Sequence, residues 1–289
     1  MNNRICIFGE VLFDHFPDGS RVMGGAPFNV AWHLQAFGLS PYFVSRTGQD
    51  PEGELVRQTM RSWGMDTDGL QTDAALPTGK VQVTFVDGEP GYDIVENCAY
   101  DAIEPPDLQS CDILYHGSLA LRSKRSADTI RALRGITARQ VFIDVNLRDP
   151  WWHRREIEST LVGSNWVKLN VHELELLAST DVATAADFLD SYGLEGLIVT
   201  HGAEGAELVL ANGLQEREPA AEAPELVDTV GAGDAFSSVM LLGIALEWPA
   251  KISLQRAQAF AASIVGRRGA TVQDPAFYAD FLGQWGLSN

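Results

Sequence analysis

Short apolar runs alternate along this 289-residue chain with segments of helical periodicity, and this alternation restricts the possible folds more than any other feature. Strands that are apolar on both faces are typical of parallel sheets covered by helices on either side. Segments 126–136 and 181–193 have the period of amphipathic helices. The sequence therefore predicts a layered α/β fold with a mainly parallel central sheet. The strands are expected in the β-branched and aromatic runs 5–9, 42–48, 113–117, 141–146, 166–170 and 197–202.

Two segments depart from this alternation because they have the pattern of β-hairpins. Residues 11–23 surround the turn signal Asp18-Gly19, and residues 79–97 alternate strictly about Asp87-Gly88. Open α/β sheets bind ligands at the carboxyl ends of their strands, so a small sheet at that edge would act as a lid. We predict that the two hairpins form one small antiparallel sheet projecting from an α/β body of residues 1–10, 24–78 and 98–289.

The charge balance excludes several classes of partner. The chain has 39 acidic and 21 basic residues and a formal charge of −18. Such a surface matches neither nucleic acid, whose phosphates require Lys and Arg, nor an anionic membrane. No apolar stretch reaches the ~18 residues of a membrane span. Charge appears too early in residues 1–14 for a signal peptide, so we expect a cytoplasmic protein.

The glycine-rich segment DTVGAGDAF, residues 228–236, is the strongest local motif. Gly231, Ala232 and Gly233 allow a tight turn that exposes backbone N–H groups at the start of an apolar helix, which is an anion site. Asp234 beside that anion suits a base that deprotonates an attacking hydroxyl. The alternative is an ordinary helix start in which Asp234 only favours the helix dipole. The chain contains neither a GxxxxGK[ST] loop nor a GxGxxG fingerprint here.

A second motif, GGAPFNVAWHLQAFG, covers residues 24–38. Gly24 and Gly25 open a turn before a helix, and Asn29 lies in its first turn, facing whatever the two glycines approach. A purely structural helix start is the alternative.

A third motif, DVNLRDPWW at residues 144–152, follows a buried strand. Asp144, Asn146 and Arg148 alternate onto one side where the chain leaves the sheet, and a pocket is expected there. A polar loop without a ligand is equally compatible with this pattern.

A fourth motif, KLNVHE at residues 168–173, carries two oxygen ligands three residues apart. Asn170 and Glu173 can both face one Mg²⁺ ion or its waters at a helix start. A capping box between the same two side chains is the alternative.

In this order, the four motifs resemble the PfkB, or ribokinase-like, family of carbohydrate kinases. Segments 46–53, 199–206 and 267–270 add to the resemblance, which spans nearly the whole chain. The resemblance implies a three-layer α/β/α body with a small β-sheet lid, ATP as phosphoryl donor, Mg²⁺, and a monovalent cation such as K⁺. Residues 144–152 and the early GEVLFD are most similar to bacterial fructokinases.

The resemblance also implies a role for each matching residue. Asp234 would be the general base, with Gly231 and the N–H groups of Ala232 and Gly233 as the anion hole. The sugar would be bound by Asp14, Gly24, Gly25, Asn29, Asn146 and Arg148. The nucleotide would be bound by Lys168, Thr200, Gly202 and Gly205. Mg²⁺ would be bound by Asn170 and Glu173 through water, and the monovalent cation by Asp228 and Val230.

The sequence departs from the family pattern in three places. Gln49 stands where an acidic residue is common, and His201 stands where an apolar residue is usual. SIVGRRGA, residues 263–270, is only loosely similar to the family's stretch near the adenine and cation sites. His172 and His201 are interpreted as solvent-facing, and His33 as an ordinary part of its helix.

The function implied is transfer of the γ-phosphoryl group of ATP to the 6-hydroxyl of D-fructose. A kinase for another sugar, such as 2-keto-3-deoxygluconate or ribose, remains an alternative. A non-catalytic sugar sensor has no need of a base like Asp234. A dinucleotide-dependent oxidoreductase is disfavoured because ICIFGE carries one glycine after the first strand. The expected partners are a small-molecule sugar and ATP. The exposed strand edges of the lid could also pair with those of a second copy, so a homodimer through the lid is an open alternative.

Overall fold

The protein is described by a computed structural model covering residues 4–86, 89–136, 138–178, 184–221 and 228–287. Its central sheet has nine strands in the order β13-β12-β11-β10-β9-β8-β1-β4-β5. All neighbours from β11 to β5 are parallel, and β12 and β13 complete the sheet as antiparallel strands. The strands are β1 (Ile5–Phe8), β4 (Tyr42–Gly48), β5 (Leu70–Asp73), β8 (Cys111–His116), β9 (Ala138–Asp144), β10 (Trp166–Asn170), β11 (Gly196–Thr200), β12 (Ala206–Leu210) and β13 (Gln215–Glu218).

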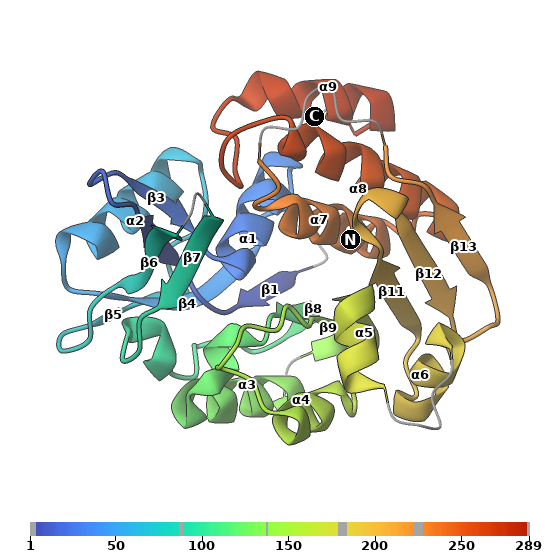
Figure 1. Cartoon of the computed structure of the whole chain (residues 1–289), viewed down its shortest axis with the longest axis horizontal. Coiled ribbons are helices and arrows are strands. Elements are labelled where there is room, and N and C mark those ends of the chain that lie inside the picture. Colours follow the sequence, from blue (N-terminus) through green and yellow to red (C-terminus); the bar gives the residue numbers. More distant parts are fainter. Residues whose placement is uncertain (1–3, 87–88, 137, 179–183, 222–227, 288–289) are drawn as a thin grey trace.

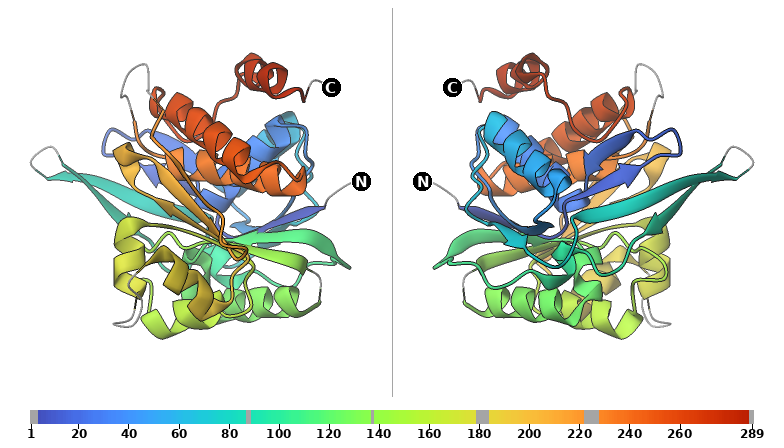
Figure 2. Two further views of the ribbon diagram at one scale, coloured as in Figure 1. Left: turned by 90° about the vertical axis from the view of Figure 1, so that its right-hand side faces the viewer. Right: turned by 90° about the vertical axis from the view of Figure 1, so that its left-hand side faces the viewer.

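Helices cover both faces of this sheet (Figures 1 and 2). One layer contains α1 (Ala26–Ala36), α2 (Pro51–Ser62), α7 (Ala232–Ala245) and α8 (Ala250–Val265), with α9 (Pro275–Trp285) outside it. The other contains α3 (Lys124–Ile136), α4 (Arg154–Leu161), α5 (Val171–Leu177) and α6 (Ala185–Tyr192). Short 3₁₀ turns occur at Ala99–Ala102, Leu119–Arg122 and Gly202–Glu204. The predicted three-layer α/β/α fold is confirmed.

Helix α7 lies at the centre of its layer. Residues 235–243 are all buried, because α7 packs between the sheet, α1 and α8. A helix enclosed on every side can be apolar all round, which explains the long apolar run that follows the glycine motif.

A separate sheet has four strands in the order β3-β2-β6-β7: β2 (Leu12–His15), β3 (Arg21–Gly24), β6 (Gly79–Val86) and β7 (Glu89–Ile94). Each hairpin is antiparallel, but β2 pairs with β6 in parallel, so the prediction of an antiparallel sheet was wrong at this junction. Both β2 and β6 follow parallel strands of the main sheet, β1 and β5, and leave it at the same edge, so they run in the same direction. The predicted turn at Asp87-Gly88 lies outside the described residues.

The small sheet is fixed to the body through one of its faces. Phe13 is buried in the core, and His15 and Arg21 both contact Glu52 of α2, at 2.9 and 3.1 Å. Asp14 alternates with these residues along β2 and therefore lies on the opposite face, where its register partner is Val22. In Figure 2 the β6–β7 hairpin extends beyond the edge of the main sheet.

Because the neighbouring strands from β11 to β5 are parallel, their carboxyl ends lie at the same edge of the sheet. Strand β1 lies between β8 and β4. The strands β4 and β5 follow on one side of β1, and the strands from β8 to β13 follow on its other side. The strand order therefore reverses at β1, and open α/β sheets bind ligands at such a switch point. In the described part of the chain, every helix is too short or too polar to cross a bilayer.

Candidate active site

The α7 entry segment, residues 228–234, forms a turn that presents free backbone donors. Gly231 caps α7 in the left-handed region, at φ 81° and ψ −5°, where a residue without a Cβ is favoured. The first helical bond is from Ala235 N–H to the Gly231 carbonyl, at 2.8 Å. Within the described chain the N–H groups of Gly233 and Asp234 have no partner, whereas that of Ala232 makes a long 3.4 Å bond to Thr229. This arrangement can bind an anion.

Asn29 and Asp234, which are 205 residues apart in sequence, meet at this point. The Asn29 side-chain amide donates a 2.8 Å hydrogen bond to Asp234 Oδ2. Asp234 Oδ1 accepts no hydrogen bond from the residues described, so it is available to a ligand. Burial raises the pKa of Asp234 to about 6, while the Asn29 hydrogen bond and the charges of Lys168 and Arg148 oppose the shift. The carboxylate is thus ionised at neutral pH and basic enough to take a proton.

A buried ion pair lies behind the α7 entry segment. Lys168 Nζ lies 2.8 and 2.9 Å from the two carboxylate oxygens of Asp144. Ser237 Oγ of α7 donates to Asp144 at 2.6 Å, and Tyr115 OH at 3.3 Å. A Cβ placed on Gly233 would lie 3.6 Å from Lys168 Nζ, so the ammonium group is directly adjacent to the turn. The Asp144 carboxylate neutralises this ammonium group, and at Asp234 the charge of Asp144 outweighs that of Lys168, so the pair adds no net positive potential there.

Four polar side chains form a second group, which we call the sugar-side group: Glu10, Asp14, Asn29 and Arg148. Burial raises the pKa of Asp14 to about 6, and the neighbouring charge of Arg148 opposes the shift. Burial likewise raises the pKa of Glu10 to about 7; the charge of Asp234 acts in the same direction and that of Arg148 against it. Glu10 Oε2 and Asn29 Oδ1 are buried without a hydrogen-bond partner. Sequence reasoning missed Glu10, although an acid between the apolar runs ICIF and VLF was a visible signal.

The remaining predicted sugar contacts border this group. Gly25 packs so closely on the backbone of Glu10 that a Cβ would lie 2.7 Å from the Glu10 carbonyl oxygen, whereas Gly24 has open space beside it. Asn146 has a positive φ of 43°, and its carbonyl accepts a 3.1 Å hydrogen bond from Ser118 Oγ.

Asn170 and Glu173 form the capping box that was the alternative to a metal site. Asn170 Oδ1 accepts from Glu173 N–H at 2.9 Å, and Glu173 Oε2 accepts from Asn170 N–H at 2.8 Å. Glu173 Oε1 accepts a further 2.7 Å bond from Leu147 N–H, and burial raises the pKa of Glu173. No cluster of three or more His, Cys, Asp or Glu side chains in the described ranges could hold a metal ion. Any Mg²⁺ here would therefore need ligands from substrate phosphates and water.

The other predicted nucleotide residues lie beside this helix start. Thr200 pairs in register with Asn170 across the ends of β10 and β11. Gly202 and Gly205 both have positive φ, 58° and 110°, in the turn that follows. A Cβ on Gly205 would lie 2.1 Å from the Glu218 carbonyl, so this glycine is required by packing.

The two residues predicted for a monovalent cation lie in the α7 entry segment. The Asp228 carboxylate accepts hydrogen bonds from Val230 N–H at 3.0 Å and Gly269 N–H at 3.2 Å. Val230 is 44% exposed. Asp228 thereby ties the segment to the turn that follows α8.

The three histidines interpreted from the sequence differ in their surroundings. His172 is exposed and His201 is half-buried. His33, interpreted from sequence as an ordinary helix residue, is fully buried and hydrogen-bonded at both ring nitrogens.

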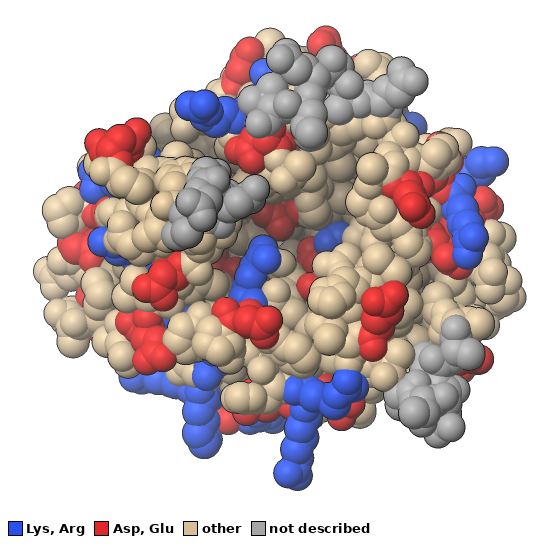
Figure 3. Space-filling view, viewed as in Figure 1, with Lys and Arg blue, Asp and Glu red and all other residues tan. Residues whose placement is uncertain are grey.

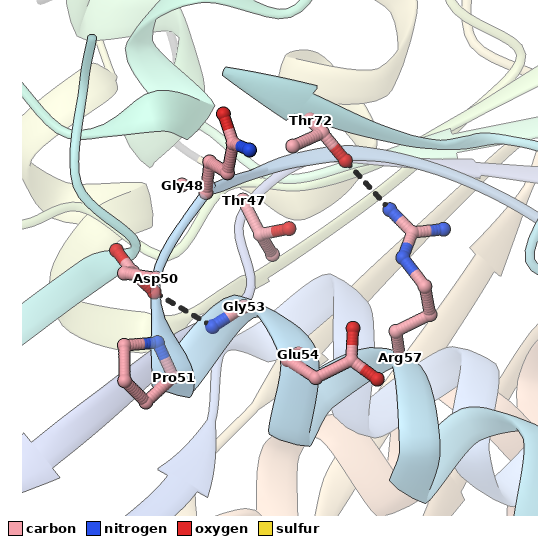
Figure 4. Close-up of a pocket in the computed structure, with 9 residues that line it drawn as sticks. Thr47, Gly48, Asp50, Pro51, Gly53, Glu54, Arg57 and Thr72 are labelled. Atoms are coloured by element: carbon pink, nitrogen blue, oxygen red, sulfur yellow. Dashed lines mark hydrogen bonds between the residues drawn. The ribbon is translucent and has the colours of Figure 1, made fainter. Parts of the chain in front are cut away.

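Figure 3 shows a hollow near the middle of the face where the strands end, with acidic and basic side chains on its floor. A different pocket of about 330 Å³ lies beside α2 and contains none of the predicted site residues. Figure 4 shows two hydrogen bonds between residues that line it: Arg57 donates to Thr72 at 2.9 Å, and Gly53 N–H donates to Asp50 at 2.8 Å. Gln49 lines this second pocket, so the departure from the family pattern at that position lies away from the base.

Comparisons with known proteins show the family and the fold of this chain. Fructokinase from Klebsiella pneumoniae is 31% identical over 264 residues, which cover 85% of each chain. The crystal structure of aminoimidazole riboside kinase from Salmonella enterica, complexed with aminoimidazole riboside and an ATP analog, matches with a TM-score of 0.82 at 26% identity, covering 97% of this chain and 99% of that one. Fructokinase with bound ATP from Xylella fastidiosa shares the fold, with a TM-score of 0.84 at 23% identity and coverage of 99% and 100%. The profile of pfkB family carbohydrate kinases matches residues 5–276, and the chain therefore belongs to this family of carbohydrate kinases.

Proposed function

We propose that this carbohydrate kinase transfers the γ-phosphoryl group of ATP to the 6-hydroxyl of D-fructose, with Asp234 as the general base. The observation that carries the proposal is the Asn29–Asp234 hydrogen bond. It holds one oxygen of a carboxylate with a raised pKa and leaves the other free beside two unpaired N–H groups. A base and an anion site in contact are what phosphoryl transfer to a hydroxyl requires.

The proposed step conserves atoms and charge. Asp234 Oδ1 accepts the proton of the sugar hydroxyl while the hydroxyl oxygen forms a bond to the γ-phosphorus. The bond from that phosphorus to the bridging oxygen of ADP breaks, and ADP leaves with the bonding electrons. The free N–H groups at the start of α7 donate to the oxygens of the transferring group.

The phosphoryl donor fits the residues on this side of the site. Gly231, Ala232 and Gly233 would bind the phosphates, and Lys168, Thr200, Gly202 and Gly205 would border the nucleotide. Mg²⁺ would supply charge neutralisation on the phosphates when bound, near Asn170 and Glu173. Asp228 and Val230 remain the proposed site of a monovalent cation such as K⁺.

The sugar-side group supports a polyhydroxy acceptor. Arg148 can donate several hydrogen bonds and Asp14, Glu10 and Asn29 can accept them, so hydroxyl groups of a sugar would satisfy them. Gly24, Gly25 and Asn146 would border the same ligand. The Klebsiella relative is a fructokinase, which favours fructose over 2-keto-3-deoxygluconate or ribose. The choice of position 6 over position 1 rests on the family alone.

We also propose that the small sheet, within residues 11–23 and 79–97, serves as the lid. Its Asp14-bearing face also carries Val22, which is 40% exposed, and the sheet exposes Phe85 and Tyr92 at 54% and 56%. Closing such a face over a bound sugar would exclude water from the reacting groups.

A coupled ADP-release assay over fructose, ribose, 2-keto-3-deoxygluconate and aminoimidazole riboside tests the acceptor, followed by phosphorus NMR of the product. We expect fructose to react fastest and to give fructose 6-phosphate. Fructose 1-phosphate, or faster reaction of another sugar, would overturn the fructose assignment. Binding of sugars without ADP release would instead support a non-catalytic sensor.

A further inference from the structure

Three residues on one face of α1 contact both the proposed base, Asp234, and residues 270–272, which pack against the α7 entry segment. Asn29, Trp32 and His33 are related by helical spacings of three and four residues and therefore share a face. Asn29 donates to Asp234 at 2.8 Å. Trp32 Nε1 donates to the Val272 carbonyl at 2.9 Å, and His33 Nε2 lies 3.0 Å from the Ala270 carbonyl.

The hydrogen bonds of His33 fix its tautomer. A carbonyl oxygen can only accept, so Nε2 must carry the proton shared with Ala270. Nδ1 then accepts from the hydroxyl of Tyr278, 2.9 Å away on α9, in place of the longer 3.2 Å bond that the same hydroxyl proton can make to the Val272 carbonyl. Burial lowers the pKa of His33 to about 3, so the ring is neutral at physiological pH and the arrangement persists. Phe260 packs edge-on against the ring and blocks other orientations.

Ala270, which His33 holds, packs directly on the α7 entry segment. A Cβ on Gly231 would lie 2.3 Å from the Ala270 Cβ, so the two backbones are in contact. Asp228 Oδ2 accepts from Gly269 N–H at 3.2 Å and ties the segments together one residue earlier. The α7 entry segment therefore packs against the turn formed by residues 269–272.

We infer that His33, oriented by Tyr278, is a positioning residue that holds Ala270 against Gly231 and so sets the α7 entry segment for phosphate binding. The inference rests on the proposed role of that segment as the phosphate site. Helix α1 would then connect two parts of the site. Asn29 orients the proposed base, Asp234, and His33, four residues later, orients the α7 entry segment through Ala270. A small displacement of such groups has a large effect on rate because the reacting atoms must be aligned.

The test compares two substitutions of His33. His33→Leu keeps an apolar side chain in the cavity but removes the donor to Ala270. His33→Gln keeps an N–H donor that can reach the same carbonyl. We expect His33→Leu to weaken binding of a non-hydrolysable ATP analogue, measured by calorimetry without sugar, by about 10-fold and to lower kcat by about 10-fold. We expect His33→Gln to recover most of both losses. Tyr278→Phe, which removes only the hydroxyl, should give a smaller loss of the same kind.

The matched control is Phe281→Leu, which loosens the same aromatic cluster around Phe260 without touching residues 269–272. All measurements are made well below each variant's melting temperature. Loss of melting temperature in His33→Leu with unchanged affinity for the ATP analogue and unchanged kcat would overturn the inference. An equal loss of analogue affinity in Phe281→Leu would also overturn it. Binding of the analogue requires no sugar, so failure of the fructose assignment leaves this test intact.

Discussion

The two sides of the active site differ in how completely their polar groups are paired. Behind the α7 entry segment, Lys168, Asp144 and Ser237 satisfy one another within the protein. On the sugar side, neither Asp14 nor Arg148 makes a side-chain hydrogen bond to another described residue, and Glu10 Oε2 and Asn29 Oδ1 are buried without partners. Unpaired buried polar groups are costly, and proteins retain them where a ligand completes them. The proposed phosphate side is therefore preorganised, whereas the proposed sugar side would be completed by its substrate.

The largest effect is expected where the two sides meet. Asp234→Asn removes the base but keeps the size of the side chain, so turnover should fall by roughly 10²–10⁴-fold while ATP affinity is retained. Steady-state kinetics and calorimetry check both parts. Asp190→Asn changes an exposed carboxylate on α6 and serves as the control. Turnover within a few-fold of wild type would remove Asp234 from the mechanism.

Arg148→Ala tests whether the sugar side depends on its ligand. Loss of hydrogen bonds to a charged donor should raise the sugar KM by about 10–100-fold and leave the ATP KM nearly unchanged. Arg148 opposes the raised pKa values of Asp14, Glu10 and Asp234, so the acidic limb of the pH–rate profile should also shift to higher pH. Arg155→Ala, an exposed arginine of α4, is the control. A raised ATP KM with an unchanged sugar KM would reverse the assignment of the two sides.

The unpaired carboxyl of Glu10 should be visible as a pH dependence of stability. Its pKa is raised from 4.5 to about 7 by burial, so the folded protein binds more protons than the unfolded chain between these values. The free energy of unfolding of the ligand-free protein should therefore fall as pH rises from 4.5 to 7. Denaturant unfolding across this range should show a smaller fall in Glu10→Gln than in wild type. Glu54→Gln, on the surface of α2, should leave the slope unchanged. Equal slopes for Glu10→Gln and wild type would mean that Glu10 is not a buried, titrating group.

Removing Mg²⁺ should abolish activity, because the charge on the transferring phosphoryl group needs neutralising.

Among the substitutions, the smallest effect is expected at the capping box, where the Glu173 carboxylate is already paired. Glu173→Gln should raise the Mg²⁺ concentration needed for half-maximal rate by a few-fold, if Glu173 also contacts metal-bound water. Glu175→Gln, exposed on the same helix, is the control. A magnesium titration of Glu173→Gln that overlays wild type would leave Glu173 as a helix cap alone.

Local patterns were sufficient to predict most elements of this fold. The apolar runs became the parallel strands, and the glycine motif became the start of α7, because strand and helix periods are properties of neighbouring residues. The two hairpins were also predicted correctly in their described parts, but the parallel pairing of β2 with β6 was not. A turn signal determines how one hairpin closes, whereas the join between two hairpins depends on where each leaves the body.

The sequence by itself determined the fold class, the family and the candidate base. Each of these follows from motifs and periodic patterns whose residues are close together in the chain, and the family follows from the order of those motifs. Only the tertiary structure decided which distant groups contact one another: Asn29 with Asp234, Lys168 with Asp144, and His33 with Ala270. It also decided the charge state of the site, since the raised pKa values of Glu10 and Asp234 come from burial and from neighbouring charges supplied by other elements. Burial and electrostatic interaction depend on distance in space, and a linear pattern specifies distance along the chain alone.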